Sequence, residues 1–330
     1  MTREIVVLAT PIYGMALPPS LVQRIEALGE VRLVPLSREG VVHADAEAAL
    51  EAAEVLLRGG IPGSVLDHVL GRTPHLEWIH SASAGVDRVA TPAVRSRGIR
   101  VTNARGVFSR PIAEYVVMML LAIGHRLPQL LELQRERTWQ PLRGTELGGL
   151  TVAIVGYGSI GSELAALLEP FGTRVIATRR RPELGSGGRA NVEVFGHDAL
   201  EQVLAEADAV VLTAPLTAET GGMIGAAQLQ AMRESAWLIN ISRGRLIDEA
   251  ALRRALESGW IAGAVLDVFT DEPLPADSPL YETPNLVITP HTSWSSDQVV
   301  ERGVELFVDN LRRYLAGEPL RNLVDLEAGY

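Results

Sequence analysis

The sequence predicts an α/β protein of two lobes, each built on a parallel sheet with helices between successive strands. Three observations indicate this class. The first hundred residues alternate strand-like apolar runs with helical stretches, and a second series of the same kind surrounds a glycine-rich turn at residues 156–161. With 330 residues, 47% of them hydrophobic, the chain is also long enough for two domains with separate cores.

In the first lobe, strand-like runs and helical stretches alternate as far as residue 102. The expected strands cover residues 5–9, 31–35, 54–58, 76–80 and 99–102, and the expected helices lie around 21–28, 44–53 and 65–70. A long helical segment then begins near Ser109, with Pro111 tolerated in its first turn, and continues through Ile123. We expect this helix to link the lobes.

The second lobe begins with the apolar run at 151–155. The later strands are expected at 174–178, 209–213, 236–241, 261–266 and 286–289, with helices at 199–205, 226–232 and 249–258. The last helix, from about residue 296 to 315, follows the completed second sheet and is expected to pack back on the first lobe. The prediction is therefore a discontinuous substrate-binding domain, residues 1–102 and 296–330, with a nucleotide-binding domain inserted at 103–295, both Rossmann-like.

The turn Gly156-Tyr157-Gly158-Ser159-Ile160-Gly161 has the pattern G-x-G-x-x-G and lies between a strand and a helix. In a dinucleotide-binding turn, the first glycine permits the tight turn, the second lets the backbone approach a pyrophosphate, and the third allows close helix–strand packing. The N–H groups at the helix start would hold the anion. A glycine turn without a ligand is the alternative, but the order of strand, turn, helix and second strand favours a dinucleotide site.

The residues after the second strand of this unit predict which dinucleotide binds. An NAD site usually has an acidic residue about 20 residues after the glycine motif, where its carboxylate binds the ribose 2′-hydroxyl. This chain instead has Arg179, 18 residues after Gly161, followed by Arg180 and Arg181. Because a guanidinium fork suits a 2′-phosphate, we predict NADP as the cofactor, with NAD possible. The alternative is an arginine-rich surface loop.

Composition excludes several kinds of chemistry. The chain has no cysteine, which removes disulfides, thiolate metal sites and cysteine nucleophiles, and no metal site is expected. All 30 basic residues are arginine, so a Walker-A loop, a pyridoxal Schiff base and a lysine base are excluded. A net charge of −10 disfavours nucleic-acid partners, and no apolar run predicts a membrane span or a signal peptide. We expect a cytoplasmic protein.

Three segments with chemically active side chains follow predicted strands of the second lobe: 240–245, 267–273 and 289–294. Open α/β sheets bind ligands at such strand ends. With the glycine motif, these segments resemble the D-isomer-specific 2-hydroxyacid dehydrogenase family, and the resemblance covers nearly the whole chain. Segments 81–87 and 316–322 also look like family segments.

The resemblance implies a catalytic arginine, glutamate and histidine at Arg243, Glu272 and His291. Reduction of a 2-oxo acid needs a cation for the carboxylate, a hydride donor and an acid for the developing alkoxide. Arg243 would bind the carboxylate and polarise the carbonyl. His291 would donate the proton, because histidine gains and loses its charge near neutral pH. Glu272 would hold the ring in place and favour its cationic form.

The same resemblance implies further binding residues. Ala84 and Gly85 would offer backbone N–H groups to the substrate carboxylate, and Asp267 would contact the nicotinamide amide. Leu216, Thr217 and Ser242 are expected to line the cofactor cleft. Trp294, bulkier than the usual family residue, is expected either to wall the substrate pocket or to pack between the lobes. The remaining histidines are interpreted as structural: His43, His68, His75, His80, His125 and His197.

The leading hypothesis is an oxidoreductase that transfers a hydride between NADP(H) and a small 2-oxo or D-2-hydroxy acid, with glyoxylate or hydroxypyruvate as the expected substrate. The alternatives are a nucleotide-sensing corepressor-like binding protein and a formate or phosphite dehydrogenase of the same fold. Glu272 speaks against the formate branch, which pairs its histidine with an amide. The resemblance also implies a homodimer, with residues 126–150, including Trp139, as the exchange region.

Overall fold

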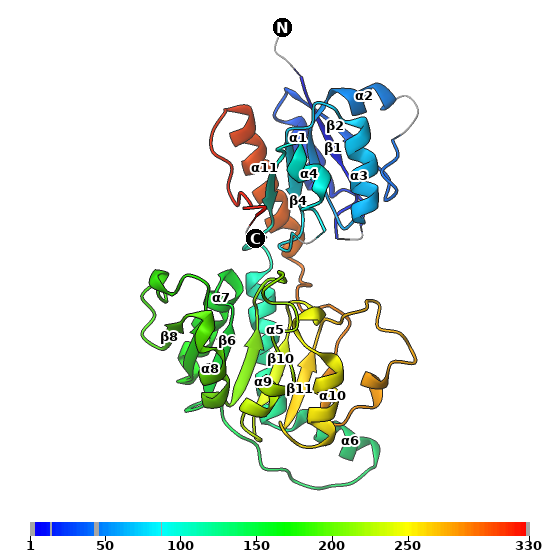
Figure 1. Cartoon of the computed structure of the whole chain (residues 1–330). Helices are drawn as coiled ribbons and strands as arrows, with labels where there is room; N and C mark the ends of the chain where they lie inside the picture. The colour runs from blue at the N-terminus through cyan, green and yellow to red at the C-terminus, as the bar shows by residue number, and fades with distance from the viewer. Residues whose placement is uncertain (1–3, 14, 43–45, 87, 328–330) are drawn as a thin grey trace. The chain divides into compact units, whose positions relative to one another are not determined.

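The structure is a computed structural model that describes residues 4–13, 15–42, 46–86 and 88–327. His43 and Asp87, two residues of the sequence predictions, lie outside this part. Contacts divide the chain into two units (Figure 1). Unit 1 comprises Met1–Phe108 and Ser296–Tyr330, and unit 2 comprises Ser109–Ser295. The chain thus passes from unit 1 to unit 2 after Phe108, six residues beyond the expected boundary at 102 and immediately before the long helix.

Unit 1 contains a five-stranded parallel sheet in the order β2-β1-β3-β4-β5. The strands are β1 (Ile5–Ala9), β2 (Val31–Pro35), β3 (Ala53–Arg58), β4 (Trp78–Ser81) and β5 (Arg100–Asn103). The helices are α1 (Pro19–Glu26), α2 (Glu47–Ala52), α3 (Gly63–Arg72), α4 (Pro92–Ser96) and α11 (Val299–Leu315).

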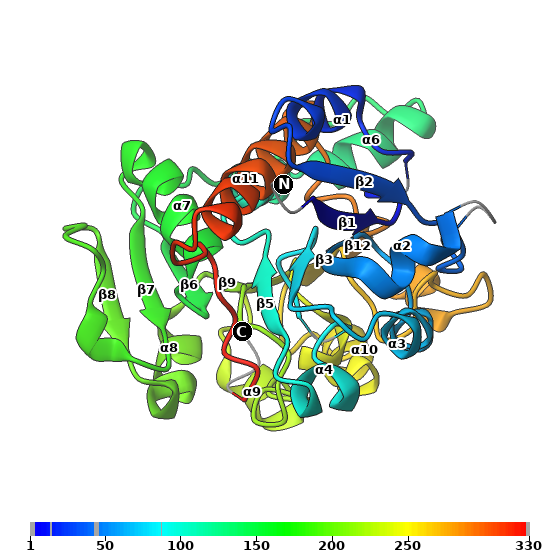
Figure 2. The ribbon, with the colours of Figure 1, turned by 90° about the horizontal axis from the view of Figure 1, so that it is seen from above.

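Helices cover both faces of this sheet (Figure 2). On one face, α1 and the C-terminal helix α11 pack on alternate side chains of β1 and β3, with Leu21 and Phe307 fully buried. On the other face, α2, α3 and α4 bury Leu8, Leu56 and Leu66. Because both faces are covered, the inner strands β1, β3 and β4 are buried along almost their whole length.

Unit 2 contains a seven-stranded parallel sheet in the order β12-β11-β10-β9-β6-β7-β8. The strands are β6 (Thr151–Val155), β7 (Arg174–Thr178), β8 (Val192–Phe195), β9 (Ala209–Leu212), β10 (Trp237–Asn240), β11 (Gly263–Leu266) and β12 (Leu286–Ile288). The chain order reverses between β6 and β9, so this is the topological switch point, where doubly wound sheets bind ligands.

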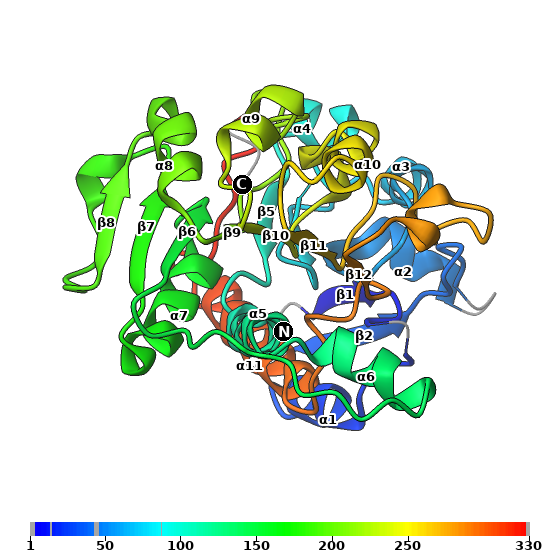
Figure 3. The ribbon, with the colours of Figure 1, turned by 90° about the horizontal axis from the view of Figure 1, so that it is seen from below.

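Helices also lie on both faces of the second sheet (Figure 3). One face carries α5 (Ser109–Gly124) and α7 (Ser159–Leu168), which pack on each other. The other carries α8 (Leu200–Glu206), α9 (Ala226–Ala231) and α10 (Glu249–Glu257). Between α5 and β6, the chain forms α6 (Leu127–Arg135).

The predicted fold class is confirmed: the protein is α/β, with two parallel sheets flanked by helices. Most predicted elements occur within two or three residues of their expected limits. The sequence patterns missed α4, α6 and β8. The first and last are only five and four residues long, and α6 buries none of its side chains, so none of them shows a clear apolar period.

No single helix among the described residues is long and apolar enough to cross a membrane. The pair α5 and α6, bent by 60° at the intervening break, passes the test of length and composition when taken together.

His80, interpreted from sequence as structural, is buried on β4, and its Nδ1 lies 2.8 Å from the hydroxyl of Thr102. The same hydroxyl accepts a hydrogen bond from the indole N–H of Trp78. Burial lowers the pKa of His80 to about 3. The ring therefore stays neutral in the folded protein over the normal pH range.

We expect His80→Asn to make the protein less sensitive to acid. An unfolded histidine takes up a proton below about pH 6.5, whereas the folded one does not, so folded-state stability is lost as pH falls from 6.5 towards 3. Between pH 7 and 5 this loss is about 2 kcal/mol, and the variant should avoid it. Urea unfolding at both pH values measures the difference. The exposed His68, replaced by Gln, is the control, and equal pH dependence in wild type and His80→Asn would contradict the prediction.

Candidate active site

The glycine turn follows β6 at the switch point. Gly156 has φ 102°, and a Cβ there would lie 2.4 Å from the backbone nitrogen of Ala214, the segment after β9. A Cβ on Gly161 would lie 2.9 Å from Ile154. At Gly156 both the positive φ and the close backbone exclude a side chain, and at Gly161 the close approach of Ile154 does so.

Gly158 differs, because a Cβ there would meet no protein atom nearer than 4.0 Å. The chain itself therefore leaves this side of the turn open. Gly158 is the N-cap of α7, and the hydrogen bonds of the helix begin with the N–H of Ser162. The N–H groups of Ser159, Ile160 and Gly161 precede that bond and lie at the positive end of the helix dipole. This combination suits a pyrophosphate.

The arginine run after β7 is partly engaged within the protein. The guanidinium of Arg179 donates to the carbonyl of Gly185 at 2.8 Å and lies 6.0 Å from the ring centre of Tyr157. The hydroxyl of Tyr157 donates to Ser186, so both side chains hold the glycine-rich loop at 184–188. Arg180 is half-exposed and lies 3.8 Å from Glu219. Arg179 thus helps to hold this loop, whereas Arg180 pairs with Glu219.

Residues 214–221 and 241–243 extend from β9 and β10 beside the glycine turn. Ser242 donates its hydroxyl proton to the carbonyl of Ala214, which joins the two loops. Thr217 closes a turn with Thr220, whose hydroxyl donates to the carbonyl of Pro215 at 2.7 Å. Leu216 is partly buried against the core of unit 2. The predicted contacts of Leu216, Thr217 and Ser242 with a cofactor stay predictions.

Arg243 follows β10 in a loop that the chain holds closely. Asn240 donates its side-chain amide to the carbonyl of Arg243 at 2.9 Å. At the next residue, a Cβ on Gly244 would overlap the backbone of Phe269, only 1.9 Å away. This glycine therefore lets the Arg243 loop pack backbone to backbone against the segment that leads to Glu272.

His291 and Glu272 form a direct pair. The Nδ1 atom of His291 lies 2.8 Å from Oε2 of Glu272, and the other carboxylate oxygen accepts the N–H of Phe269. The imidazole side chain is 41% exposed, so its other nitrogen can meet a substrate. A histidine held in this way by a carboxylate is oriented to donate a proton through Nε2.

The backbone of His291 has φ 50°, a left-handed conformation that is uncommon outside glycine. Its N–H donates to the carbonyl of Asp267 at 2.8 Å, and its own carbonyl accepts the indole N–H of Trp294 at 2.9 Å. These two contacts hold the unusual conformation. Trp294 thus supports the histidine loop, and its predicted place in the substrate pocket stays a prediction.

Asp267, at the end of β11, is fully buried. One carboxylate oxygen accepts the hydroxyl of Thr289 at 2.6 Å and the N–H of Thr292, and the other accepts the N–H of Ser293. The carboxylate therefore fastens the loop that carries His291. Its predicted contact with the nicotinamide amide stays a prediction.

Sequence reasoning missed Tyr115 on α5, whose hydroxyl lies 2.6 Å from that of Thr289. Burial, the larger cause, raises the pKa of Tyr115 to about 12. No local pattern could have found this residue, because 174 positions separate the partners.

Ala84 and Gly85 belong to unit 1, in the loop after β4. The carbonyl of Ala84 accepts the side-chain amide of Asn103 at 2.8 Å, and that of Gly85 accepts the hydroxyl of Ser83. Within the described chain, the N–H groups of Ala84 and Gly85 donate to no protein acceptor. Their predicted role as anion donors stays a prediction.

Among the residues with a described placement, no group of three or more His, Asp and Glu side chains could hold a metal ion.

A doubly wound sheet with a glycine turn at its switch point, and an Arg, a Glu and a His at neighbouring strand ends, defines a nicotinamide-dependent oxidoreductase. The model of the D-isomer specific 2-hydroxyacid dehydrogenase family, NAD binding domain, matches residues 117–293. The chain belongs to this family, whose enzymes move a hydride between a nicotinamide dinucleotide and a 2-oxo or 2-hydroxy acid.

Relatives and solved structures agree with this membership. A glyoxylate reductase from Korarchaeum cryptofilum is 37% identical, over 78% of this chain and 79% of its own length. A glycerate dehydrogenase from Methylorubrum extorquens is 33% identical, over 84% and 87%. A family member from Xanthobacter autotrophicus Py2, solved with NADPH and MES, is 29% identical with a TM-score of 0.85, and covers 99% of this chain and 100% of its own.

Proposed function

We propose that this protein reduces a small 2-oxo acid, glyoxylate or hydroxypyruvate, to the D-2-hydroxy acid with NADPH. The observation that carries the proposal is the His291–Glu272 pair, which follows a dinucleotide-binding turn in the same unit. Relatives named glyoxylate reductase and glycerate dehydrogenase support the substrate class. A glyoxylate/hydroxypyruvate reductase from Sinorhizobium meliloti, solved with NADP and sulfate, shares the fold with a TM-score of 0.82.

Each catalytic side chain has a task in this reaction. When bound, NADPH would supply the hydride for C2 of the oxo acid. Arg243 binds the carboxylate and polarises the carbonyl through its planar fork. His291 donates a proton to the carbonyl oxygen as negative charge develops there, while Glu272 orients the ring and stabilises its cationic form. In the oxidation direction, His291 removes the proton from the hydroxyl.

The cofactor site fits a phosphorylated dinucleotide. The open side of Gly158 and the N–H groups of Ser159, Ile160 and Gly161 suit the pyrophosphate. Arg179 and Arg180 follow β7, where the adenosine ribose lies in this fold. The half-exposed Arg180 is the clearer candidate for the 2′-phosphate, because Arg179 also holds the loop at 184–188.

We expect Arg180→Gln to raise the KM for NADPH about tenfold and to leave that for NADH within about twofold, because only NADPH carries the 2′-phosphate and one charged hydrogen bond is worth about 1.5 to 3 kcal/mol. Preference for NADPH in the wild type should also narrow as salt rises above about 0.15 M. Replacing Arg179 as well should weaken the binding of both coenzymes, since the loop at 184–188 loses its support. Arg189→Gln is the control, and a wild type that prefers NADH would contradict the assignment.

A panel of 2-oxo acids, assayed with NADPH and with NADH, tests the proposed function. Turnover of glyoxylate or hydroxypyruvate with NADPH at ordinary enzymatic rates supports it. A nucleotide-sensing protein would bind NADPH and turn over no acid in the panel. Turnover of formate or phosphite alone would favour the third alternative, which the Glu272 carboxylate disfavours.

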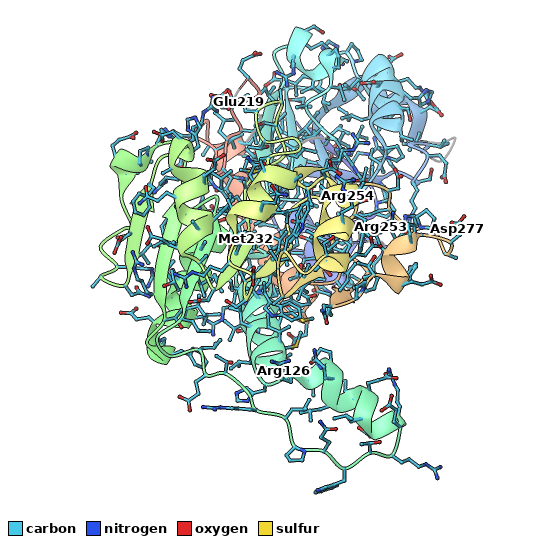
Figure 4. The ribbon with its side chains drawn as sticks, turned by 60° about the horizontal axis from the view of Figure 1, so that its bottom comes forward. Arg126, Glu219, Met232, Arg253, Arg254 and Asp277 are labelled. Carbon is cyan, nitrogen blue, oxygen red and sulfur yellow. The ribbon has the colours of Figure 1, made fainter. Side chains whose placement is uncertain are left out.

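We further propose a cytoplasmic homodimer built on α6 and the segment after it. This part extends away from the rest of unit 2 beyond Arg126 (Figure 4). Leu127, Leu130 and Leu131 are exposed on α6, and Trp139 is fully exposed. With Met118 on α5, Leu127 and Leu130 form an apolar surface of the kind that a subunit interface covers. Sedimentation of wild type and Trp139→Ser measures the state of association.

A further inference from the structure

Tyr115 and Thr289 are joined by a hydrogen bond whose direction the neighbouring contacts determine. Thr289 has one hydroxyl proton, and it donates that proton to Asp267 at 2.6 Å, since a carboxylate can only accept. The contact of 2.6 Å between the hydroxyls of Tyr115 and Thr289 must then be a donation from Tyr115. The three groups form a chain that runs from α5 through the histidine loop to the end of β11.

The Asp267 end of this chain fixes His291 in place. The carboxylate holds the loop at Thr289, Thr292 and Ser293, which surround the histidine on both sides. The backbone carbonyl of Asp267 accepts the N–H of His291. A left-handed backbone is uncommon outside glycine, and these contacts help the one at His291 to persist.

Tyr115 is suited to a permanent donor role. Burial raises its pKa to about 12, so the hydroxyl keeps its proton wherever the enzyme works. The tyrosine is part of α5, which packs along α7, the helix of the glycine turn. An ion pair of 3.1 Å between Arg110 and Glu163 also joins the two helices. The helix that braces the histidine loop is therefore fixed to the dinucleotide site.

We propose that Tyr115 is a positioning residue for His291, acting through Thr289 and Asp267. The proposal rests on the proposed function only in assigning the proton transfer to His291. Tyr115 reaches the histidine through a hydrogen-bond chain and touches neither substrate nor cofactor in this role. Loss of its hydroxyl should loosen the histidine loop and leave the glycine turn intact.

We expect Tyr115→Phe, which keeps the ring and removes one hydroxyl, to lower kcat about three- to tenfold, the range that one hydrogen bond gives. The KM for NADPH should stay within about twofold. Tyr281→Phe, at an exposed tyrosine of the same unit, is the matched control and should match wild type. Thr289→Val should lower kcat at least as much as Tyr115→Phe does. The double variant should lower kcat no further than Thr289→Val alone, since both changes break the same hydrogen-bond chain.

A measurement independent of turnover separates this proposal from the proposed function. The ring signals of His291 in the NMR spectrum, assigned by their loss in His291→Gln, should shift in Tyr115→Phe while those of His68 and His197 stay in place. This result is expected even if no oxo acid is a substrate. Coincident His291 signals in Tyr115→Phe and wild type, or additive effects of the two substitutions, would overturn the proposal.

Discussion

Replacing His291 by alanine is expected to lower kcat for 2-oxo acid reduction about 10²- to 10⁴-fold, the range that general acid–base catalysis supplies. In the proposed mechanism the imidazole donates the proton, and Glu272 is its carboxylate partner 2.8 Å away. Binding of NADPH should remain, because the glycine turn and the arginine run follow β6 and β7, whereas His291 follows the edge strand β12. Steady-state kinetics and titration of NADPH fluorescence measure the two quantities.

The backbone at His291 makes a second variant necessary. With φ at 50°, alanine would add strain of its own, whereas asparagine tolerates this conformation well. His291→Asn should therefore lose turnover as fully as His291→Ala while keeping the loop in place. The exposed His197, replaced by Gln, should behave as wild type. Turnover near the normal rate in His291→Asn would remove the histidine from the mechanism.

Arg243→Lys is expected to lower kcat/KM for the oxo acid about 10- to 100-fold although the charge is kept. An ammonium cannot make the two parallel hydrogen bonds that a guanidinium makes to a carboxylate, and a lost charged hydrogen bond costs about 1.5 to 3 kcal/mol. The KM for NADPH should change little. The comparison to make is the kinetics of Arg243→Lys and of Arg245→Lys, the exposed arginine two residues on.

The packing of its loop makes the effect of Arg243→Lys on kcat/KM interpretable. Gly244 and the amide of Asn240 fix the backbone at residue 243, so only the head group changes in Arg243→Lys. Arg245→Lys should retain wild-type kinetics. If Arg243→Lys keeps kcat/KM within about twofold of wild type, the substrate carboxylate binds elsewhere.

The sequence predicted the two parallel sheets and the family, because their signals are local. Buried parallel strands are continuous apolar runs, and the turn at 156–161 needs glycine at Gly156 and Gly161 for reasons that the structure makes explicit. Arg243, Glu272 and His291 were identified by resemblance, and the structure shows Glu272 and His291 in direct contact. Short or exposed elements such as β8 and α6 carried no such signal.

Tertiary structure alone decided how the site is held together. The hydrogen bonds of Asp267 and of the Tyr115 hydroxyl join segments that lie far apart in the chain, and the former hold the loop in which His291 has its left-handed backbone. Apolar periodicity records which face of a helix or strand is buried, and motif spacing records which residue types recur. Neither records which polar group meets which across the fold, because that pairing exists only once the β11, β12 and α5 segments have packed together.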